Sequence, residues 1–197
     1  MPAAFRPKRS KDGRMALVAT LHHIEIALSD ADRGVYESLD LRVARHPSET
    51  MKYLLTRVLG FCLLHEEGLA FGKGLSSTEE PAAWVTEAGG RVRLWVDIGR
   101  PSAERLHKAS KAADRVVVCT TDPPEVLRRA TEGERIHRAG EIEIVSIAKA
   151  LVEALEPVTG RAARWEVVHS GGHLYVTTGG KSYDGAVERS NLGAAEE

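Results

Sequence analysis

The chain has 197 residues, of which 43% are hydrophobic and 28% charged, and its formal net charge at pH 7 is −1. This length and composition are typical of one globular domain, and the near-zero charge excludes a protein that coats nucleic acid through bulk charge. The sequence has no apolar run of about 18 residues or more, so no membrane span is predicted.

The first third of the chain predicts a β-hairpin followed by a helix. Apolar and β-branched residues favour a strand over 16–30, and alternating apolar residues favour a second strand within 35–47. An apolar stripe with helical spacing predicts the clearest helix of the chain over 48–68. We expect Ser48 to cap its beginning and Gly68 to end it.

The middle and end of the chain predict a mixed α/β sheet. Five further strands are expected at 69–71, 82–86, 91–98, 116–121 and 142–147. Helices are expected after Ser102, which is a good N-cap, after Asp122, and over 148–156. The order strand, helix, strand within about 30 residues predicts a right-handed crossover between parallel strands. A C-terminal β-hairpin is expected over 164–180.

These patterns divide the chain into three parts. We expect a disordered basic lead over 1–14, one α/β domain over 15–178 and a loose tail over 179–197. Both cysteines, Cys62 and Cys119, lie in apolar runs, which is typical of reduced, buried thiols in a cytoplasmic protein.

Asp97 is the first candidate for chemistry, because it closes the apolar strand 91–98 directly before a glycine turn. In α/β proteins, ligand sites gather beyond the carboxyl ends of strands. Asp97 therefore has two interpretations, as a residue that starts a turn or as a ligand of a hard cation such as Mg²⁺. Lys108 on the following helix is placed to reach back toward it, although a solvated helix face is the favoured interpretation of this lysine taken alone.

Two more acidic positions stand out. Glu49 is expected in the first turn of the helix 48–68, where the helix dipole favours a carboxylate whatever its function. Glu79 and Glu80 precede Pro81 and the next strand, and a solvated loop is their simplest interpretation. His169 and His173 flank a Gly-Gly turn, which favours a plain turn over a shared metal.

Four stretches together resemble the YaeQ family of bacterial proteins. They are ARHPSET, EEPAAW, LWVDIG and RPSAERLHKAS, and the resemblance covers about 15–178 in the same order. It implies a variant of the restriction-endonuclease-like PD-(D/E)XK fold, with a mixed central sheet flanked by helices and a carboxylate site of the metal-dependent nuclease type. It does not imply a biological role.

Carried over by position, the resemblance makes Glu49 the helix acid, places Asp97 in the (D/E) slot and makes Glu80 the acid of the PD segment, with Glu79 as its alternative. The chain departs from the motif at Gly99, where a lysine is expected. Lys108 is the candidate to replace that lysine.

Two hypotheses follow. The first is a Mg²⁺- or Mn²⁺-dependent phosphodiester hydrolase (a nuclease) acting on nucleic acid. Its metal ligands are expected to be Glu49, Glu80, Asp97 and the carbonyl of Ile98. Lys108 would offset charge on the phosphate. Its nucleic-acid groove would need the basic side chains of Arg91, Arg93, Arg100 and Arg105.

The second hypothesis is a catalytically inactive nuclease-fold module that binds a protein or nucleic-acid partner. Gly99 and the near-neutral net charge favour it. The choice between DNA and RNA, the mode of cleavage and the oligomeric state stay open at this point.

Overall fold

The computed structural model describes residues 19–73 and 80–193 of the chain. The predicted lead 1–14 and the alternative acid Glu79 lie outside the described residues. The end of the predicted tail, 194–197, lies outside them as well.

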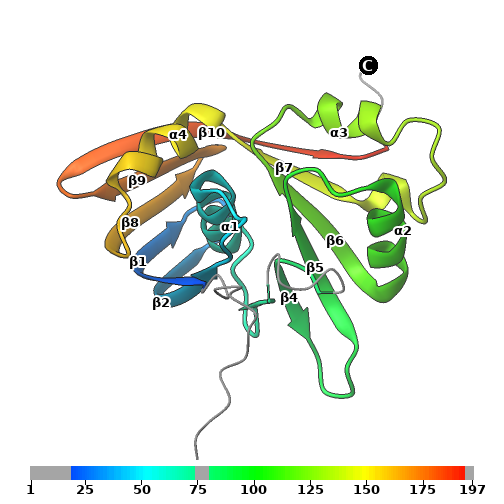
Figure 1. The fold of residues 1–197 in the computed structure, drawn as a ribbon, viewed down its shortest axis with the longest axis horizontal. Helices are drawn as coiled ribbons and strands as arrows, with labels where there is room; N and C mark the ends of the chain where they lie inside the picture. The colour runs from blue at the N-terminus through cyan, green and yellow to red at the C-terminus, as the bar shows by residue number, and fades with distance from the viewer. Residues whose placement is uncertain (1–18, 74–79, 194–197) are drawn as a thin grey trace, which may run out of the picture.

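The described strands form one mixed sheet in the order β2-β1-β8-β9-β10-β7-β6-β5-β4-β3. The strands are β1 (Thr20–Asp30), β2 (Val35–Arg45), β3 (Ala70–Phe71), β4 (Ala83–Thr86), β5 (Val92–Ile98), β6 (Ala113–Thr120), β7 (Glu143–Ile147), β8 (Ala162–Ser170), β9 (His173–Thr178) and β10 (Lys181–Asn191). The sheet curves until it is nearly closed, and Figure 1 shows α1 inside the curve.

Four α-helices occur in the described part of the chain: α1 (Met51–Leu63), α2 (Ala103–Ala112), α3 (Pro124–Ala130) and α4 (Lys149–Leu155). Short 3₁₀ helices span Ala139–Glu141 and Glu156–Val158. In Figure 1, α2 and α3 lie on the outer side of the β5–β7 part of the sheet, and α4 lies against β10.

Two apolar cores hold these layers together. The larger core surrounds α1, whose Leu54, Leu55, Val58 and Leu59 are fully buried against the inner face of the sheet. The smaller core lies on the other face of β5, β6 and β7, where Leu106 of α2 packs with side chains of those strands. Burial on both faces explains the continuous apolar run of β6.

The predicted mixed α/β fold is confirmed. The β1–β2 hairpin, the β8–β9 hairpin and the parallel β5–α2–β6 crossover are all present. Ser102 caps α2 as expected, since its side chain accepts a hydrogen bond from the Arg105 amide. Cys62 and Cys119 are both buried thiols, and burial raises the pKa of each to about 12.

The expected boundaries of α1 are wrong. Thr50, not Ser48, caps the helix, because the Thr50 hydroxyl accepts from the Tyr53 amide at 3.1 Å, whereas the Ser48 hydroxyl bonds the His46 ring. The helix ends at Leu63, well before Gly68. Arg33, from the β1–β2 turn, donates to the carbonyls of Cys62 and His65 there, and so satisfies backbone groups at the helix end.

The expected cap of α3 is also wrong. Asp122 does not cap the helix, because both of its carboxylate oxygens accept hydrogen bonds from Arg100, at 2.6 and 2.9 Å. The helix begins at Pro124, where the fixed backbone angle of proline favours a first helical turn.

The expected loose tail from residue 179 is wrong over most of its length. Residues 181–191 form β10, which pairs antiparallel with β9 on one side and β7 on the other. This strand joins the two halves of the sheet. Its sequence hides it, because most of its side chains are exposed and Gly185 interrupts the strand pattern. A Cβ at Gly185 would lie 2.7 Å from Cβ of Ala148, so β10 and the start of α4 are in close contact.

Candidate functional site

Asp97 lies near the carboxyl end of β5 and is only 3% exposed. Its two carboxylate oxygens accept hydrogen bonds from Arg105, with Nη2 to Oδ1 at 2.6 Å and Nε to Oδ2 at 2.8 Å. The same Nη2 donates to the carbonyl of Glu80 at 2.9 Å, and the guanidinium carbon lies 5.7 Å from the ring centre of Trp95. Arg105 thus ties the beginning of α2 to β5 and to the segment that precedes β4.

Glu49 is also buried, and it lies just before α1, not within its first turn as expected. Its Oε2 accepts from the His46 amide at 3.1 Å, and its Oε1 lies 3.4 Å from Nη1 of Arg57. Within the described ranges, no group donates a hydrogen bond to Oε1. Burial raises the pKa of Glu49, and the attraction of Arg57 only partly offsets this.

Arg57, one side of this pair, is held inside the protein by α1. It donates to the carbonyl of Ala44 on β2 at 2.8 Å and lies 5.5 Å from the ring centre of Phe71. Burial lowers its pKa, and the charge of Glu49 opposes that shift. Both partners therefore lose more from desolvation than they regain from each other.

The charges of both arginine–carboxylate pairs act on Tyr53. Burial raises the pKa of its phenol, and the charges that also act on that pKa include those of Glu49 and Asp97 and their partners Arg57 and Arg105. Two of the three predicted acids, 48 positions apart in the sequence, therefore lie within electrostatic reach of one phenol. Sequence reasoning missed Tyr53, because one partly buried aromatic residue near the start of a core helix carries no local signal of function.

Glu80 is oriented differently. Its carboxylate accepts from the Lys73 amide at 3.2 Å and from the Lys73 ammonium at 2.6 Å, and these bonds lower its pKa. The Glu80 carbonyl shares Arg105 as a hydrogen-bond donor with Asp97. Across 19–73 and 80–193, no group of three or more His, Cys, Asp or Glu side chains is arranged to hold a metal ion.

The structure places Lys108 as an exposed residue of α2, and the cation bound to Asp97 is Arg105, one helical turn earlier. The signal was present in the sequence, because the Ser102 cap fixes the start of α2 and brings its first turn close to the end of β5. Ile98 is buried, and its side chain belongs to the larger core.

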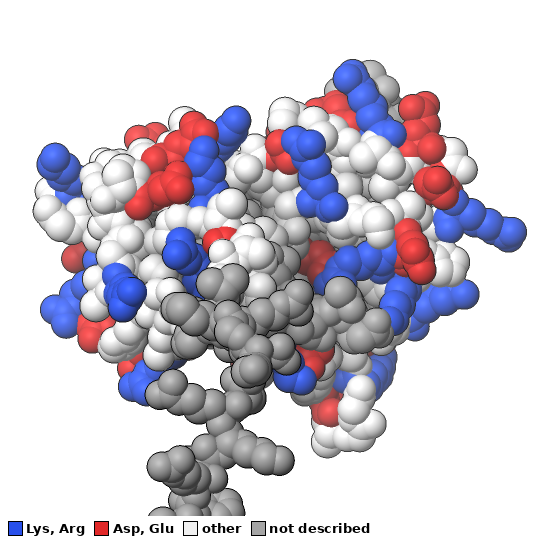
Figure 2. All heavy atoms as spheres, viewed as in Figure 1, with Lys and Arg blue, Asp and Glu red and all other residues white. Residues whose placement is uncertain are grey.

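The four arginines predicted to line a nucleic-acid groove are each paired with a carboxylate. The pairs are Arg91–Asp114 at 2.9 Å, Arg93–Glu66 at 3.4 Å, Arg100–Asp122 at 2.6 Å and Arg105–Asp97 at 2.6 Å. On the face shown in Figure 2, positive and negative side chains are interspersed. These partners neutralise much of the charge that a basic groove would need.

A second buried polar cluster joins the two hairpins. Asp30 is fully buried and accepts hydrogen bonds from His169 Nδ1 at 3.0 Å and from Arg33 Nε at 2.6 Å. Asp32 accepts the amides of Gly171 and Gly172 in the opposite turn. His169 therefore links the β8–β9 hairpin to the end of β1.

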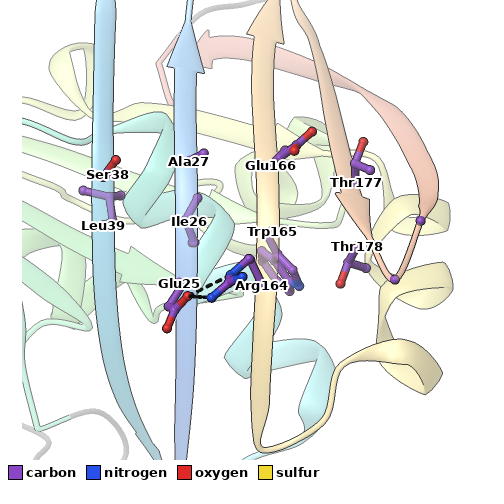
Figure 3. A pocket seen from close by; sticks show the side chains of 12 residues that line it. Glu25, Ile26, Ala27, Ser38, Leu39, Arg164, Trp165, Glu166, Thr177 and Thr178 are labelled. Carbon is purple, nitrogen blue, oxygen red and sulfur yellow. Dashed lines mark hydrogen bonds and ion pairs between the residues drawn. The ribbon is translucent and has the colours of Figure 1, made fainter.

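A shallow pocket of about 520 Å³ lies elsewhere, on the outer face of β1, β2, β8 and β9 (Figure 3). Arg164 and Glu25 form an ion pair at its rim, with Nη2 to Oε2 at 2.6 Å. None of the site residues predicted from the sequence lines this pocket. We therefore place the candidate site at the buried pairs, where the predicted carboxylates lie.

In the described part of the chain, no helix has the length and apolar character needed to cross a membrane.

These features define a class of mixed α/β protein in which a nearly closed sheet surrounds a central helix and two arginine–carboxylate pairs act electrostatically on a tyrosine of that helix. The family described as YaeQ protein matches residues 15–186, and the chain belongs to that family. The resemblance inferred from the sequence is confirmed.

Two solved structures are similar to this chain. The YaeQ protein from Xanthomonas axonopodis pv. citri has a TM-score of 0.80 at 29% identity, covering 87% of this chain and 97% of that one. The YaeQ protein from Pseudomonas syringae has a TM-score of 0.77 at 30% identity, covering 90% and 97%. Among curated proteins, the uncharacterized protein YaeQ of Escherichia coli K12 is 35% identical over 106 residues, which are 54% of this chain and 59% of that protein. The chain thus covers less than two thirds of the length of this relative.

Proposed function

We propose that the protein is a Mg²⁺- or Mn²⁺-dependent phosphodiester hydrolase acting on nucleic acid, with Glu49 and Asp97 as ligands of the cation. The observation that supports this proposal is that two buried carboxylates, from separate parts of the chain, both act electrostatically on Tyr53. Mg²⁺ is typically bound by one or two carboxylates, with water and substrate phosphate completing its shell.

Glu49 and Asp97 differ in how readily each could bind a cation. Glu49 has a buried oxygen, Oε1, that accepts no hydrogen bond from the described residues, and a cation would satisfy it. Asp97 already accepts two hydrogen bonds from Arg105. Binding of a cation at Asp97 therefore requires Arg105 to give up at least part of this contact. A guanidinium released in this way is well suited to bind a phosphate.

The bound cation would supply an activated water and polarise the phosphate. Arg105 and Lys108 would offset the charge that develops on the phosphate oxygens. Tyr53 would donate a hydrogen bond, since its raised pKa keeps the phenol protonated at neutral pH. The proposal includes the relation to the PD-(D/E)XK fold, in which Glu80 and the Ile98 carbonyl are the further ligands.

Cleavage of labelled single- and double-stranded DNA and RNA, with Mg²⁺ or Mn²⁺, tests the proposal. We expect metal-dependent cleavage by the wild type and loss of it in Glu49→Gln and Asp97→Asn. Glu153→Gln is the matched control, because Glu153 forms an exposed pair with Lys52. Lys108→Ala should slow cleavage while metal binding is kept, and unchanged cleavage would remove its role. If the wild type cleaves none of the substrates, the hydrolase proposal is wrong.

The second candidate function is the inactive module that binds a protein or nucleic-acid partner. The observation that favours it is the neutralisation of both buried carboxylates by guanidinium groups, Asp97 by Arg105 and Glu49 by Arg57. Absence of both cleavage and metal binding, with retained binding of nucleic acid, would support this function.

A further inference from the structure

The outer edge of β2 is a long strand edge that pairs with no strand among the described residues, and one of its outward groups, the Ala44 carbonyl, accepts a hydrogen bond from Arg57. β2 has 11 residues and is the first strand in the sheet order, and Figure 3 shows it as the outermost strand of that region. Among the described residues, no strand pairs with its outer side. Proteins usually shorten such edges or protect them with charged side chains, proline or a covering segment. β2 is long and contains no proline, and its charged residues are Glu37, Asp40, Arg42 and Arg45.

Two hydrogen bonds show which residues of β2 turn their backbone outward. The amide of His23 on β1 donates to the carbonyl of Arg161, next to β8. The backbone N–H and C=O groups of odd-numbered residues of β1 therefore point toward β8, and those of even-numbered residues point toward β2. Ile24 pairs with Leu41, so the odd-numbered residues of β2 bond to β1. The even-numbered residues 36–44 therefore direct N–H and C=O groups outward. The carbonyl of Ala44 agrees with this, since it accepts from Arg57.

The side chains of β2 are complementary to those of a second β2 strand in one antiparallel register. With Leu41 opposite its own copy, Asp40 lies opposite the partner subunit's Arg42, and the reverse pair forms across the two-fold axis. On the other face, Glu37 lies opposite the partner subunit's Arg45. Leu39 lies opposite the partner subunit's Val43. In this register the even-numbered residues form the hydrogen-bonded pairs, as the outward groups require.

Neighbouring registers lose this match. If the partner strand slides by two residues in one direction, Asp40 lies opposite the partner subunit's Asp40. If it slides by two residues in the other direction, Arg42 lies opposite the partner subunit's Arg42. A shift by one would turn the apolar side chains of one strand to the polar face of the other. The sequence of β2 therefore favours one symmetric pairing.

We infer that two copies of this chain associate through β2, so that one sheet continues across a two-fold axis. The charges of the central pair are available. Among the described residues, no ion pair engages Arg42, and Asp40, whose side chain is 62% exposed, binds only His23. Glu37 and Arg45 form no ion pair in the described part of the chain, but Nε of Arg45 is buried within its own chain. An isologous two-fold contact of this kind is the commonest form of homodimer. The inference does not depend on the proposed hydrolase activity.

Charge reversal tests the inference on the full chain, with sedimentation equilibrium over a series of protein concentrations. The wild type is expected to dimerise. Asp40→Arg and Arg42→Asp should each weaken the dimer by about tenfold or more, because each places like charges opposite each other twice. The double variant Asp40→Arg/Arg42→Asp restores opposite charges and should restore the dimer. A mixture of the two single variants should form a heterodimer.

A disulfide cross-link tests the register independently. Ser38 lies opposite the partner subunit's Ala44, at a Cα separation of about 5.5 Å that a disulfide can span. Within one chain the two positions are about 20 Å apart, too far for a bond. Ser38→Cys/Ala44→Cys should therefore form a covalent dimer on oxidation, and Ser38→Cys alone should not. A wild type that is monomeric at its highest soluble concentration, or a dimer that both reversals leave unchanged, would overturn the inference.

Discussion

Arg105 is bonded at once to the carboxylate of Asp97 and to the carbonyl of Glu80, through an Nη2 that lies 2.6 Å from the first and 2.9 Å from the second. This one side chain binds the carboxylate that the proposed function assigns to a cation. It connects the stability of the fold with the proposed chemistry, because any ion that binds Asp97 competes with it.

Removal of Arg105 should destabilise the protein strongly. Arg105→Ala leaves the Asp97 carboxylate buried without its partner, and we expect a loss of about 3 kcal/mol in the free energy of unfolding. Arg100→Ala is the matched control, since Arg100 pairs with Asp122 at the surface with 61% of its side chain exposed, and should lose less than about 1 kcal/mol. Urea unfolding measures both values. Equal losses would show that the Asp97 pair contributes no more than a surface pair.

Gly185 should tolerate no side chain. In Gly185→Ala the added Cβ would meet Ala148 at 2.7 Å and Leu151 at 2.9 Å, so α4 or β10 must shift, and we expect a loss of about 1–3 kcal/mol. Gly140→Ala is the control, because a Cβ there meets nothing within 4 Å. Thermal unfolding compares the two variants. If Gly185→Ala is as stable as Gly140→Ala, β10 does not pack on α4 as described.

The main elements of the fold could be predicted because they carry strong local signals. The apolar stripe of α1, the Ser102 cap of α2 and the Gly-Gly turn between β8 and β9 all depend on neighbouring residues alone. β10 could not be predicted, because it is stabilised by pairing with β7 and β9 and has Val187 as its one buried side chain. Whether this segment forms a strand depends on residues far away in the sequence.

The candidate site was predictable only in part, for a similar reason. Asp97 and Glu49 stand out by their places at a strand end and before a helix, and both are buried as a site requires. The Ser102 cap indicates that the first turn of α2 lies close to the end of β5. It does not by itself decide between Arg105 and Lys108, because that choice depends on the exact phase of α2 against β5. The bond between Arg57 and Ala44 depends on the curvature of the sheet.

Asp30 should make stability depend on acidity. Burial raises its pKa, but hydrogen bonds from His169 and Arg33 outweigh burial, and the net shift is below the ordinary value of 3.8. A lowered folded-state pKa stabilises the protein above the unfolded-state pKa, and this contribution is lost as pH falls through the folded value. The difference in unfolding free energy between wild type and Asp30→Asn should therefore shrink below about pH 4. Urea unfolding at several pH values measures it, and a difference that is constant down to the acid transition contradicts the assignment.

Glu49 should make metal binding sensitive to protons. Its pKa is raised by burial above the ordinary 4.5, and a cation binds the carboxylate and not the acid. Affinity for Mn²⁺ should therefore fall as pH is lowered from about 7.5 toward 5. Glu49→Gln should bind Mn²⁺ more weakly and with a smaller dependence on pH. If wild type and Glu49→Gln show the same pH dependence, Glu49 is not a ligand.

The central claim, that Asp97 and Glu49 together hold a divalent cation, is tested most directly by calorimetric titration of Mn²⁺ into the wild type and into Asp97→Asn. The account predicts saturable binding by the wild type and loss of that binding in Asp97→Asn, while the variant stays folded by circular dichroism. No binding by the wild type at millimolar Mn²⁺, or equal binding by both proteins, would contradict it.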